Sequence, residues 1–433
     1  MIPAEQAEAA ALLQRLTGAA PGMYRDVVPV TRGADGVRLG GTGEVVDWVV
    51  RMARVPAGDF LDEMAARGAL TPGLLRELAD AVAALHLGLP RLSRDLPAAF
   101  RAITQGNARS ALAAGLDPAA VAQWQAACLG WIDGHADWLR QREADGFVRR
   151  GHGDLHLGNL CLWQGHPVPF DALEFDEDLA TLDVGYDLAF LLMDLDVRVG
   201  RTAANAVMNR YVARTGDAGL VGGLPLFLSQ RAMVRAHVQA ARGLPADDYV
   251  RHAGAYIAPS PPMLVAIGGL PGSGKSTVAR QLAPLLGAAP GALVLRSDEI
   301  RKRQHGATPE TRLGPQAYTP AASARVFAEL ADAARPAVAS GHSVIADATF
   351  MAATHRSLIH DAAGSALFHG IWLDVPEDVL RQRVAARTGD ASDADLAVLD
   401  RALQAGAGAG DWRLVPGSDG AAALVAVMGI TGL

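Results

Sequence analysis

The first part of the chain mixes helical periodicity with short alternating stretches of apolar and polar residues. Alternation on both sides of a turn predicts a hairpin. In chain order, the predicted elements are a strand over Val45–Met52, helices over 69–86 and 110–142, a hairpin of Leu160–Trp163 and Val168–Asp171 joined by Gln164–Pro167, and a largely helical segment over 183–243. Helices therefore dominate this part, and the strands are confined to two short regions.

The second part alternates short apolar runs with helical stretches. The runs cover Met263–Ile267, Ala292–Leu295, Val344–Ala346 and Phe368–Val375, and the helical stretches cover 276–286, 321–339 and 376–388. Strands that alternate with helices in this way usually pair in parallel, because each helix carries the chain back to the start of the next strand. The pattern thus predicts an α/β fold with a parallel sheet wrapped by helices.

A proline-rich connector separates the two parts. Between Gly254 and Pro262, three prolines interrupt any helix and favour an extended backbone. A chain of 433 residues is also too long for one ordinary hydrophobic core. We therefore predict two domains, residues 1–258 and 259–433.

Charge and cysteine content narrow the classes of function. The net charge of −7 divides into −6 for residues 1–258 (24 basic, 30 acidic) and −1 for the rest (15 basic, 16 acidic). Neither part has the basic excess of a nucleic-acid-binding surface, so stable nucleic-acid binding is not expected. Cys128 and Cys161 lack metal-ligand spacing and are expected to be buried, inert thiols. With no signal-peptide pattern and no apolar stretch long enough to cross a bilayer, we expect a cytoplasmic protein without a membrane partner, and the sequence indicates no protein partner.

A glycine-rich loop opens the second part. Residues 269–276 read GLPGSGKS, which matches G-x-x-x-x-G-K-[ST] between a predicted strand and a predicted helix. Glycines let the backbone curl and aim its N–H groups at phosphate oxygens, and a helix N-terminus favours an anion. In this motif the lysine meets the β- and γ-phosphates and the serine hydroxyl holds Mg²⁺. The predicted ATP-binding residues are Gly269, Gly272, Ser273, Gly274, Lys275, Ser276 and Thr277.

A carboxylate in a buried strand is the expected partner of that serine in the metal site. Asp347 ends the strand in SVIADAT and is predicted, with Ser276, to organise Mg²⁺. A water-activating ATPase usually has a glutamate directly after this aspartate, whereas here Ala348 follows. The sequence therefore favours transfer to an acceptor over hydrolysis.

The segment RSDEIRKR at 296–303 supplies a candidate catalytic pair. Asp298 follows the second strand, and Arg301 lies one helical turn later. A carboxylate there can take the proton of an acceptor hydroxyl, and an arginine can hold the acceptor or a phosphate. Alternatively, Asp298 is the N-cap of a helix that begins at Glu299.

Arginines follow LDVPED on the last predicted helix. Arg383 and Arg387 are four residues apart and share a face, which can close over the transferred phosphate and supply charge. In the alternative interpretation these two, with Arg381, form an ordinary solvated surface.

These segments resemble a family of P-loop kinases that includes polynucleotide-kinase-like and zeta-toxin-like proteins. The resemblance rests on GGLPGSGKST, RSDEIRK, VIADATF and LDVPEDVLRQRVAAR, and it covers most of 263–405. It implies that Asp298 is the general base and that the arginines of the last segment form a lid. The acceptor differs between members of the family, so no substrate is implied.

A second group of candidate residues lies in GHGDLHLGNL at 151–160, before the predicted hairpin. Asp154 can accept a hydroxyl proton, while Asn159 and Asp171 can hold Mg²⁺. Alternatively Asp154 and His156 are metal ligands, although a pair lacks enough partners for a closed site. Asp187, near the start of an apolar helix, can brace this loop.

The first part resembles aminoglycoside phosphotransferase-like proteins, which have a protein-kinase-like fold. DVVPV, VDWVVRM, HGDLHLGNL and FDALEFDEDLATLDVGYDLAFLLMDL carry this likeness over nearly all of 5–258. The whole chain resembles bacterial two-domain proteins in which such a domain is fused to a P-loop kinase. The implied fold is an α+β kinase-like C-lobe followed by an α/β P-loop domain.

The lysine content departs from the kinase-like pattern. Kinase-like domains hold ATP phosphates with a glycine-rich strand pair and a lysine on the third strand. The chain has only two lysines, Lys275 and Lys302, both in the second part, and residues 5–17 already resemble the glutamate-bearing helix. We therefore expect a truncated N-lobe, either because the natural start lies earlier or because the domain is pseudokinase-like. Arg51 and Arg54 are the candidates to replace the lysine.

Two classes of function remain. In the first, the P-loop domain is an ATP- and Mg²⁺-dependent kinase that phosphorylates a hydroxyl of a small molecule or nucleotide. In the second, the chain is an ATP-dependent regulatory switch with a pseudokinase-like, ligand-binding first domain. Acceptor-dependent release of ADP distinguishes them. A toxin that acts on nucleotide sugars also fits the P-loop resemblance, but the fused first domain argues against it.

Overall fold

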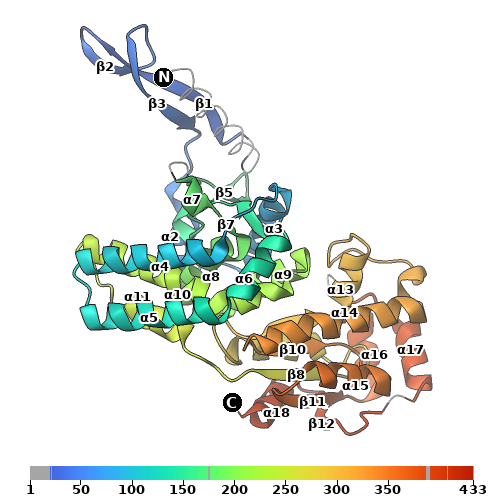
Figure 1. Ribbon diagram of the computed structural model, residues 1–433. Coiled ribbons are helices and arrows are strands. Elements are labelled where there is room, and N and C mark those ends of the chain that lie inside the picture. The colour runs from blue at the N-terminus through green and yellow to red at the C-terminus, as the bar shows by residue number, and fades with distance from the viewer. Residues whose placement is uncertain (1–19, 21, 174–175, 387–390, 407, 433) are drawn as a thin grey trace. The chain divides into compact units, whose positions relative to one another are not determined.

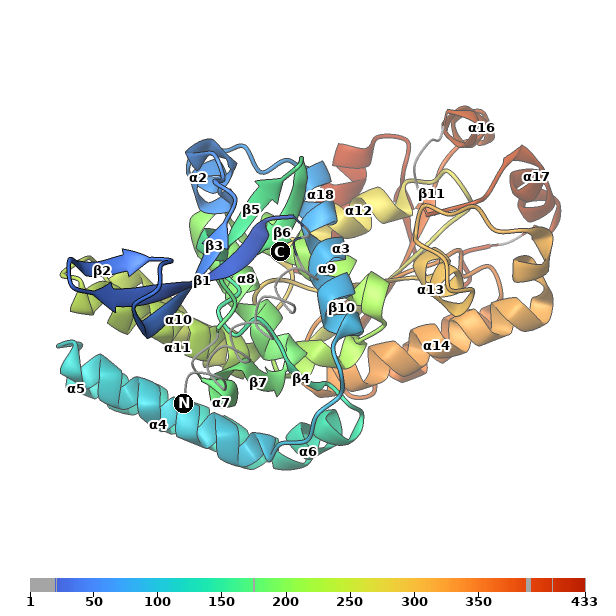
Figure 2. The same ribbon diagram turned by 90° about the horizontal axis from the view of Figure 1, so that it is seen from above.

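The computed structural model describes residue 20 and residues 22–173, 176–386, 391–406 and 408–432. Contacts divide the chain into two compact units, one of Met1–Ala102 with Ile132–Val199 and one of Ile103–Trp131 with Gly200–Leu433. The predicted boundary between residues 258 and 259 lies inside the second unit. Figures 1 and 2 show the elements of both units.

The first unit opens with a three-stranded antiparallel sheet in the order β2-β1-β3. Its strands are β1 (Tyr24–Gly33), β2 (Gly36–Leu39) and β3 (Glu44–Met52), and β3 confirms the strand predicted there. Val37 and Leu39 of β2 are 60% and 71% exposed, so this strand presents apolar side chains at the surface. At its other end, Met23 and Tyr24 join Cys161 in a small buried cluster.

Helices and short strands make up the rest of the first unit. They are η1 (Ala57–Asp59), α2 (Leu61–Ala66), α3 (Pro72–Gly88), the first part of α4 (Leu96–Ala113), α6 (Ala136–Ala144), β4 (Val148–Arg150), η2 (Leu157–Asn159), β5 (Leu160–Trp163), β6 (His166–Pro169), α7 (Glu177–Ala180), β7 (Thr181–Asp183) and α8 (Val184–Arg198). The hairpin β5–β6 is confirmed, with a shorter turn than predicted. Gln164 and Gly165 form this turn with φ values of 52° and 84°, the pair of positive angles that a tight two-residue turn requires.

The single helix predicted over 110–142 is wrong, because the structure has three helices there. After α4, Gly115 takes a left-handed φ of 84°, which an α-helix does not accommodate. The Asp117 side chain then accepts a hydrogen bond from the Ala120 N–H at 2.9 Å and caps α5 (Pro118–Gly134). Helix α6 follows after His135.

The second unit contains a five-stranded parallel sheet in the order β12-β11-β8-β10-β9, which confirms the predicted α/β fold. Its strands are β8 (Met263–Gly268), β9 (Leu293–Arg296), β10 (Val344–Asp347), β11 (Leu367–Asp374) and β12 (Arg413–Pro416). The sequence pattern missed β12, because its segment RLVP has only two apolar residues before the proline and Leu414 in it is 60% exposed. Such a short edge strand has no apolar run to reveal it.

Helices cover this sheet and continue into the segment before it. They are α9 (Arg201–Thr215), η3 (Ala218–Gly222), α10 (Leu224–Ala241), α11 (Asp247–Ile257), α12 (Lys275–Leu282), η4 (Ala283–Leu285), α13 (Ser297–Gln304), η5 (Pro315–Tyr318), α14 (Pro320–Ala339), α15 (Ala353–Ala362), α16 (Glu377–Ala385), α17 (Leu396–Gln404) and α18 (Gly420–Thr431). Within the described ranges, no helix is long and apolar enough to span a membrane.

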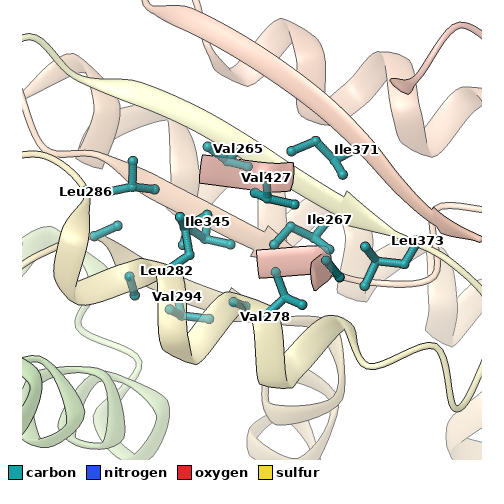
Figure 3. Close-up of a cluster of buried hydrophobic side chains, with 14 of the residues drawn as sticks. Val265, Ile267, Val278, Leu282, Leu286, Val294, Ile345, Ile371, Leu373 and Val427 are labelled. Atoms are coloured by element: carbon teal, nitrogen blue, oxygen red, sulfur yellow. The ribbon is translucent and has the colours of Figure 1, made fainter. Parts of the chain in front are cut away.

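One hydrophobic core holds the sheet to α12 and α18 (Figure 3). Val265 and Ile267 of β8 and Ile345 of β10 pack with Val278 of α12 and Val427 of α18, and all five side chains are almost fully buried. The dense packing fixes the start of α12 against the end of β8. This is where the glycine-rich loop lies.

Two asparagines of α9 form hydrogen bonds with backbone groups along the outer edge of β9. The Asn209 side chain accepts from the Val294 N–H at 2.6 Å and donates to the Ala292 carbonyl at 3.2 Å. Asn205 donates to the same carbonyl at 3.1 Å. These amides satisfy backbone groups that an edge strand otherwise leaves unpaired, so α9 is integral to the second unit.

Candidate active site

The loop between β8 and α12 depends on glycine for its shape. Gly269 has a φ of +143°, and a Cβ there would lie 2.8 Å from Ser273 Oγ. Gly272 has a φ of +87°, and its Cβ would lie 2.9 Å from the Leu380 carbonyl oxygen. Gly274, in the N-cap position of α12, has a φ of 92°. The positive φ angle disfavours any residue other than glycine at all three positions. At Gly269 and Gly272 a side chain would also be too close to neighbouring atoms.

Lys275 is the first residue of α12, and its ammonium group turns back over the loop. Nζ donates to the carbonyl oxygens of Gly269 at 2.9 Å and Leu270 at 3.0 Å. The positive charge is therefore held at the curl of backbone that precedes the helix. The combination of a cation and a helix N-terminus favours the binding of phosphate.

A serine, an aspartate and an arginine meet where three strands lead into the site. Ser276 Oγ donates to Asp347 Oδ2 at 2.6 Å. Asp347 of β10 is in register with Arg296 of β9. The Arg296 guanidinium donates to the same carboxylate oxygen at 3.2 Å and to Ser276 Oγ at 3.0 Å. The parallel register thus brings a cation against the predicted metal-binding pair.

The Ser276 and Asp347 oxygens suit Mg²⁺. Hydroxyl and carboxylate oxygens are hard ligands, and this ion is usually held by few protein groups together with water and substrate phosphates. In the described ranges, no group of three or more His, Cys, Asp or Glu side chains is arranged to hold a metal ion. The metal role of this pair stays a prediction.

Asp298 lies in the first turn of α13. The helix begins at Ser297 with Arg296 in the N-cap position, so the interpretation of Asp298 as the N-cap is wrong. Burial raises the pKa of the Asp298 carboxyl, the Arg296 charge opposes that rise, and the Asp347 charge adds to it. The Lys275 charge also acts on the Asp298 carboxyl and lowers its pKa.

Sequence reasoning missed the role of Arg296. Besides Asp347 and Ser276, it binds Glu299 Oε1 through Nη1 at 3.0 Å, and burial raises the pKa of Glu299 as well. One buried guanidinium thus balances several carboxylates around the loop. The signal was present in ALVLR, where a charged residue ends an otherwise apolar strand.

The predicted arginines have different surroundings. Arg301 donates to the Ala317 carbonyl at 2.6 Å, and its guanidinium carbon lies 4.7 Å from the centre of the Tyr318 ring. Arg383 reaches the phosphate loop, since its Nη1 donates to the Gly272 carbonyl at 3.4 Å and to the Gly417 carbonyl at 3.0 Å. Their catalytic roles stay predictions.

Two further arginines complete this group. Arg387 lies outside the described residues. Arg381 forms ion pairs with Glu377 at 2.8 Å and Asp400 at 2.6 Å, all on exposed side chains. For Arg381 the structure therefore favours the solvated surface over a lid.

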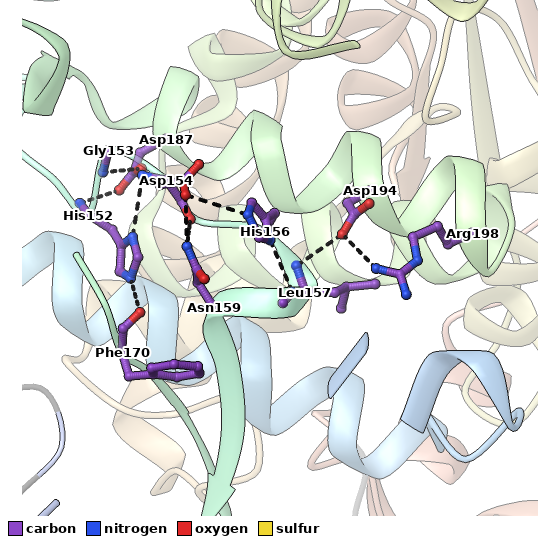
Figure 4. Close-up of polar contacts among 11 residues, drawn as sticks. His152, Gly153, Asp154, His156, Leu157, Asn159, Phe170, Asp187, Asp194 and Arg198 are labelled. Atoms are coloured by element: carbon purple, nitrogen blue, oxygen red, sulfur yellow. Dashed lines mark hydrogen bonds and ion pairs between the residues drawn. The ribbon is translucent and has the colours of Figure 1, made fainter. Parts of the chain in front are cut away.

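In the first unit, Asp187 braces the candidate loop between β4 and β5, as the sequence indicated (Figure 4). Its carboxylate accepts from the backbone N–H groups of His152 at 2.7 Å and Gly153 at 2.9 Å, and it lies 3.2 Å from His86 Nε2. The loop backbone is thereby tied to α8.

The structure brings Asp154 and Asn159 together in this loop. Asn159 Nδ2 donates to Asp154 Oδ2 at 2.9 Å, and His156 Nε2 lies 3.5 Å from the same carboxylate (Figure 4). The Phe170 N–H donates to the Asn159 carbonyl at 3.0 Å, and the next residue, Asp171, donates its backbone N–H to the Tyr24 hydroxyl at 2.9 Å. Asp171 has a φ of 60°, a strained angle for a residue with a side chain. The base and metal roles of these residues stay predictions.

Arg51, a candidate to replace the kinase lysine, is engaged on the sheet. Its Nε donates to Asp26 Oδ1 at 2.8 Å, and the two residues are cross-strand neighbours on β1 and β3. The Arg51 side chain is 60% exposed, so this ion pair lies on the open part of the sheet.

Family models match both parts of the chain. A model described as "Phosphotransferase enzyme family" matches residues 3–220, which is half of the chain, and a model described as "AAA domain" matches residues 264–407. The chain belongs to the phosphotransferase enzyme family. The predicted architecture, a kinase-like region followed by a P-loop domain, is confirmed.

Curated relatives resemble part of the chain. Uncharacterized proteins of Mycobacterium tuberculosis and Mycobacterium bovis are each 33% identical to it over 280 residues, which is 61% of this chain and 55% of the relative. The chain thus spans about half the length of these relatives.

Two solved structures are similar to part of the chain. A sugar kinase from Janibacter sp. HTCC2649 is 20% identical and covers 40% of this chain and 95% of its own, with a TM-score of 0.32. A choline kinase from Cryptosporidium parvum Iowa II is 11% identical and covers 57% of this chain and 74% of its own, with a TM-score of 0.36.

Proposed function

We propose that this chain is an ATP- and Mg²⁺-dependent phosphotransferase whose P-loop site transfers the γ-phosphate of ATP to a hydroxyl group of a small molecule or nucleotide. One observation carries the proposal. Ser276 and Asp347 are in contact at 2.6 Å directly beside the loop of Lys275. A carboxyl that can serve as base, Asp298, is within electrostatic reach of both Lys275 and Asp347.

Each group has a distinct task in this proposal. The loop N–H groups and Lys275 hold the β- and γ-phosphates in line for transfer, which is the main requirement of phosphoryl transfer. Ser276 and Asp347 hold Mg²⁺, which neutralises charge on the phosphate oxygens when bound. Arg383, already at the Gly272 carbonyl, supplies further positive charge.

Asp298 then takes the proton of the acceptor hydroxyl. Its raised pKa places it closer to neutral pH than an ordinary aspartate, which improves it as a proton acceptor. The Arg296 charge opposes this rise in the pKa of Asp298, and its guanidinium donates to Asp347 of the metal-binding pair. The match of residues 3–220 to the phosphotransferase family model supports the same class of reaction.

The test is a screen of a metabolite and nucleotide library for acceptor-dependent ADP release by the full chain. We expect at least one hydroxyl-bearing acceptor to raise ADP release and to gain a phosphoryl group, detected by mass spectrometry. The Lys275→Ala variant should show neither change. ADP release that no acceptor alters, or that persists in Lys275→Ala, would contradict the proposal.

A further inference from the structure

Arg296 forms hydrogen bonds to both residues that are proposed to hold Mg²⁺. Its Nε donates to Asp347 Oδ2 at 3.2 Å, and its Nη2 donates to Ser276 Oγ at 3.0 Å. Ser276 Oγ donates in turn to the same Asp347 oxygen at 2.6 Å. One edge of the guanidinium thus binds two oxygen atoms that are also the predicted metal ligands. A guanidinium and a divalent cation therefore require the same oxygens.

A second carboxylate binds the same guanidinium through a different nitrogen. Arg296 Nη1 donates to Glu299 Oε1 at 3.0 Å. The side chains are 8% exposed for Arg296, 4% for Asp347 and 16% for Glu299. Solvent and salt weaken charge interactions between such buried groups much less than at the surface. The arginine therefore shares its charge between two acids, of which only Asp347 is a predicted metal ligand.

The backbone that carries Arg296 is held along both edges of its strand. Arg296 ends β9 and is in register with Asp347 of β10. On the outer edge of β9, the Val294 N–H donates to the Asn209 side chain at 2.6 Å. A change in the partners of the guanidinium is therefore confined to the long, flexible side chain.

We propose that the Arg296 guanidinium competes with Mg²⁺ for the oxygens of Ser276 and Asp347. When the ion is bound, the guanidinium is held by Glu299 instead. This inference rests on the proposed function, because it assumes that Mg-ATP binds at the P-loop. The guanidinium gives up its hydrogen bonds to Ser276 Oγ and Asp347 Oδ2 and keeps the one from Nη1 to Glu299.

A competing arginine suits a buried metal site. Burying an ionised carboxylate without a counter-charge is unfavourable, so the guanidinium stabilises the charge of Asp347 before an ion binds. Metal binding is then opposed, because two positive charges repel each other and two hydrogen bonds are given up. The site therefore requires more Mg²⁺ than Ser276 and Asp347 alone would need.

The direction of the effect distinguishes competition from support. If Arg296 only held the two ligands in position, its removal would weaken metal binding, as the loss of a residue behind a metal ligand usually does. Under competition, its removal strengthens metal binding. Glu299 supplies a second sign. Without the Glu299 charge the guanidinium stays at Asp347, so metal binding weakens.

The experiment measures metal binding directly in the full chain. Carboxylate and water ligands suit Mn²⁺ as they suit Mg²⁺, so bound Mn²⁺ is measured by electron paramagnetic resonance with a saturating non-hydrolysable ATP analogue. We expect Arg296→Gln to bind Mn²⁺ more tightly by roughly tenfold or more, since about 1.4 kcal/mol of relieved repulsion gives that factor. Glu299→Gln should bind it more weakly. Equal or weaker binding by Arg296→Gln would overturn the inference.

A double variant separates this exchange from a general effect of charge. If Glu299 acts by holding the guanidinium, its contribution disappears once the guanidinium is gone. The double variant Arg296→Gln/Glu299→Gln should therefore bind Mn²⁺ as tightly as Arg296→Gln does. An effect of Glu299→Gln that is equally large in both backgrounds would overturn the exchange. Arg303→Gln is the matched control and should not change Mn²⁺ binding, because this arginine also lies on α13 but pairs with Glu329.

Arg296→Lys covers the case in which Arg296→Gln does not fold, which circular dichroism would reveal. It retains a buried positive charge, but a compact ammonium cannot reproduce the planar fork that bonds Ser276 and Asp347 together. Its Mn²⁺ affinity should lie above that of the wild type. Affinity at or below the wild-type value would count against competition as strongly as the same result in Arg296→Gln.

The outcomes also separate this inference from the proposed function. Transfer of phosphate to an external acceptor, together with unchanged or weaker Mn²⁺ binding in Arg296→Gln, would overturn the competition and leave the kinase assignment intact. If the wild-type protein binds neither the ATP analogue nor Mn²⁺ in its presence, both are contradicted.

Discussion

The chain contains two loops that each follow a strand and carry candidate catalytic residues, and they differ in how they can treat phosphate. At the P-loop, the Lys275 ammonium lies over the loop and Arg296 and Arg383 contact groups around it. In the loop of the first unit, Asp154 is bonded to the Asn159 amide and lies near the His156 ring. The P-loop therefore has several positive charges that are held in place. The loop of the first unit has an acid with polar partners.

This difference matters because phosphoryl transfer depends mainly on positioning and on neutralising charge on the phosphates. The loop of the first unit is well braced by Asp187, so its geometry is not loose. What it lacks in sequence is the kinase lysine, since both lysines of the chain lie in the other unit. We therefore expect phosphoryl transfer at the P-loop rather than at the loop of the first unit.

The largest expected effect comes from removing the P-loop cation. Lys275→Ala should abolish tight Mg-ATP binding, because the ammonium faces the phosphates. Fluorescent-nucleotide titration measures the change. Arg280→Ala is the matched control, because this arginine also lies on α12 but is exposed. The affinity of this variant for Mg-ATP should stay near that of the wild type. Equal affinity in Lys275→Ala and wild type would show that the loop is not the nucleotide site.

A smaller effect is expected on the Mg²⁺ requirement, which compares the two candidate metal sites. Asp347→Asn should raise the Mg²⁺ concentration needed for half-maximal transfer by ~10–100-fold, the scale seen when the shell of a metal site is disturbed. Asp171→Asn in the first unit should leave it unchanged. A magnesium titration of activity measures both. A larger shift for Asp171→Asn would reverse the assignment of the metal site.

The smallest expected effect is on the rate of thiol alkylation, measured at one cysteine in each unit. Burial raises the pKa of Cys128 to about 12 and that of Cys161 to about 11, so both stay protonated in the folded protein. The thiolate is the reactive form, so both should resist alkylation at about pH 8, and labelling should speed up as pH rises.

Low concentrations of urea extend this test to local stability. Cys161 belongs to the small cluster under the open sheet, whereas Cys128 is hydrogen-bonded to Ser229 inside the second unit. We expect Cys161 to be labelled at the lower urea concentration, because few buried contacts hold its surroundings. Labelling of Cys128 first would contradict this order. Mass spectrometry of alkylated peptides gives the readout.

Local features of the fold were predictable from sequence. The P-loop follows from a fixed spacing of glycines between an apolar run and a helix, and the strands β8, β9, β10 and β11 follow from their apolar runs. Gly115 and Pro118 indicated a break in the helix predicted over 110–142. The prediction of a single helix rested on apolar periodicity and did not take these two residues into account. Strand β12 was not visible, because a short exposed edge strand has no apolar signature.

Long-range contacts were not predictable. Asn209 pairs with the backbone of Val294, 85 positions away, and an asparagine on a helix carries no sign of such a partner. Sequence patterns report on neighbours along the chain, whereas the partners of polar side chains depend on how the elements pack.

The most direct test of the central claim, that the P-loop and not the kinase-like loop transfers phosphate, is to replace the two candidate bases separately in the full chain. With the acceptor found by screening, single-turnover transfer should fall by ~10²–10⁴-fold in Asp298→Asn, as expected for loss of a general base, with ATP binding nearly intact. Asp154→Asn should transfer at the wild-type rate. Full activity in Asp298→Asn together with its loss in Asp154→Asn would contradict the account and place the reaction in the first unit.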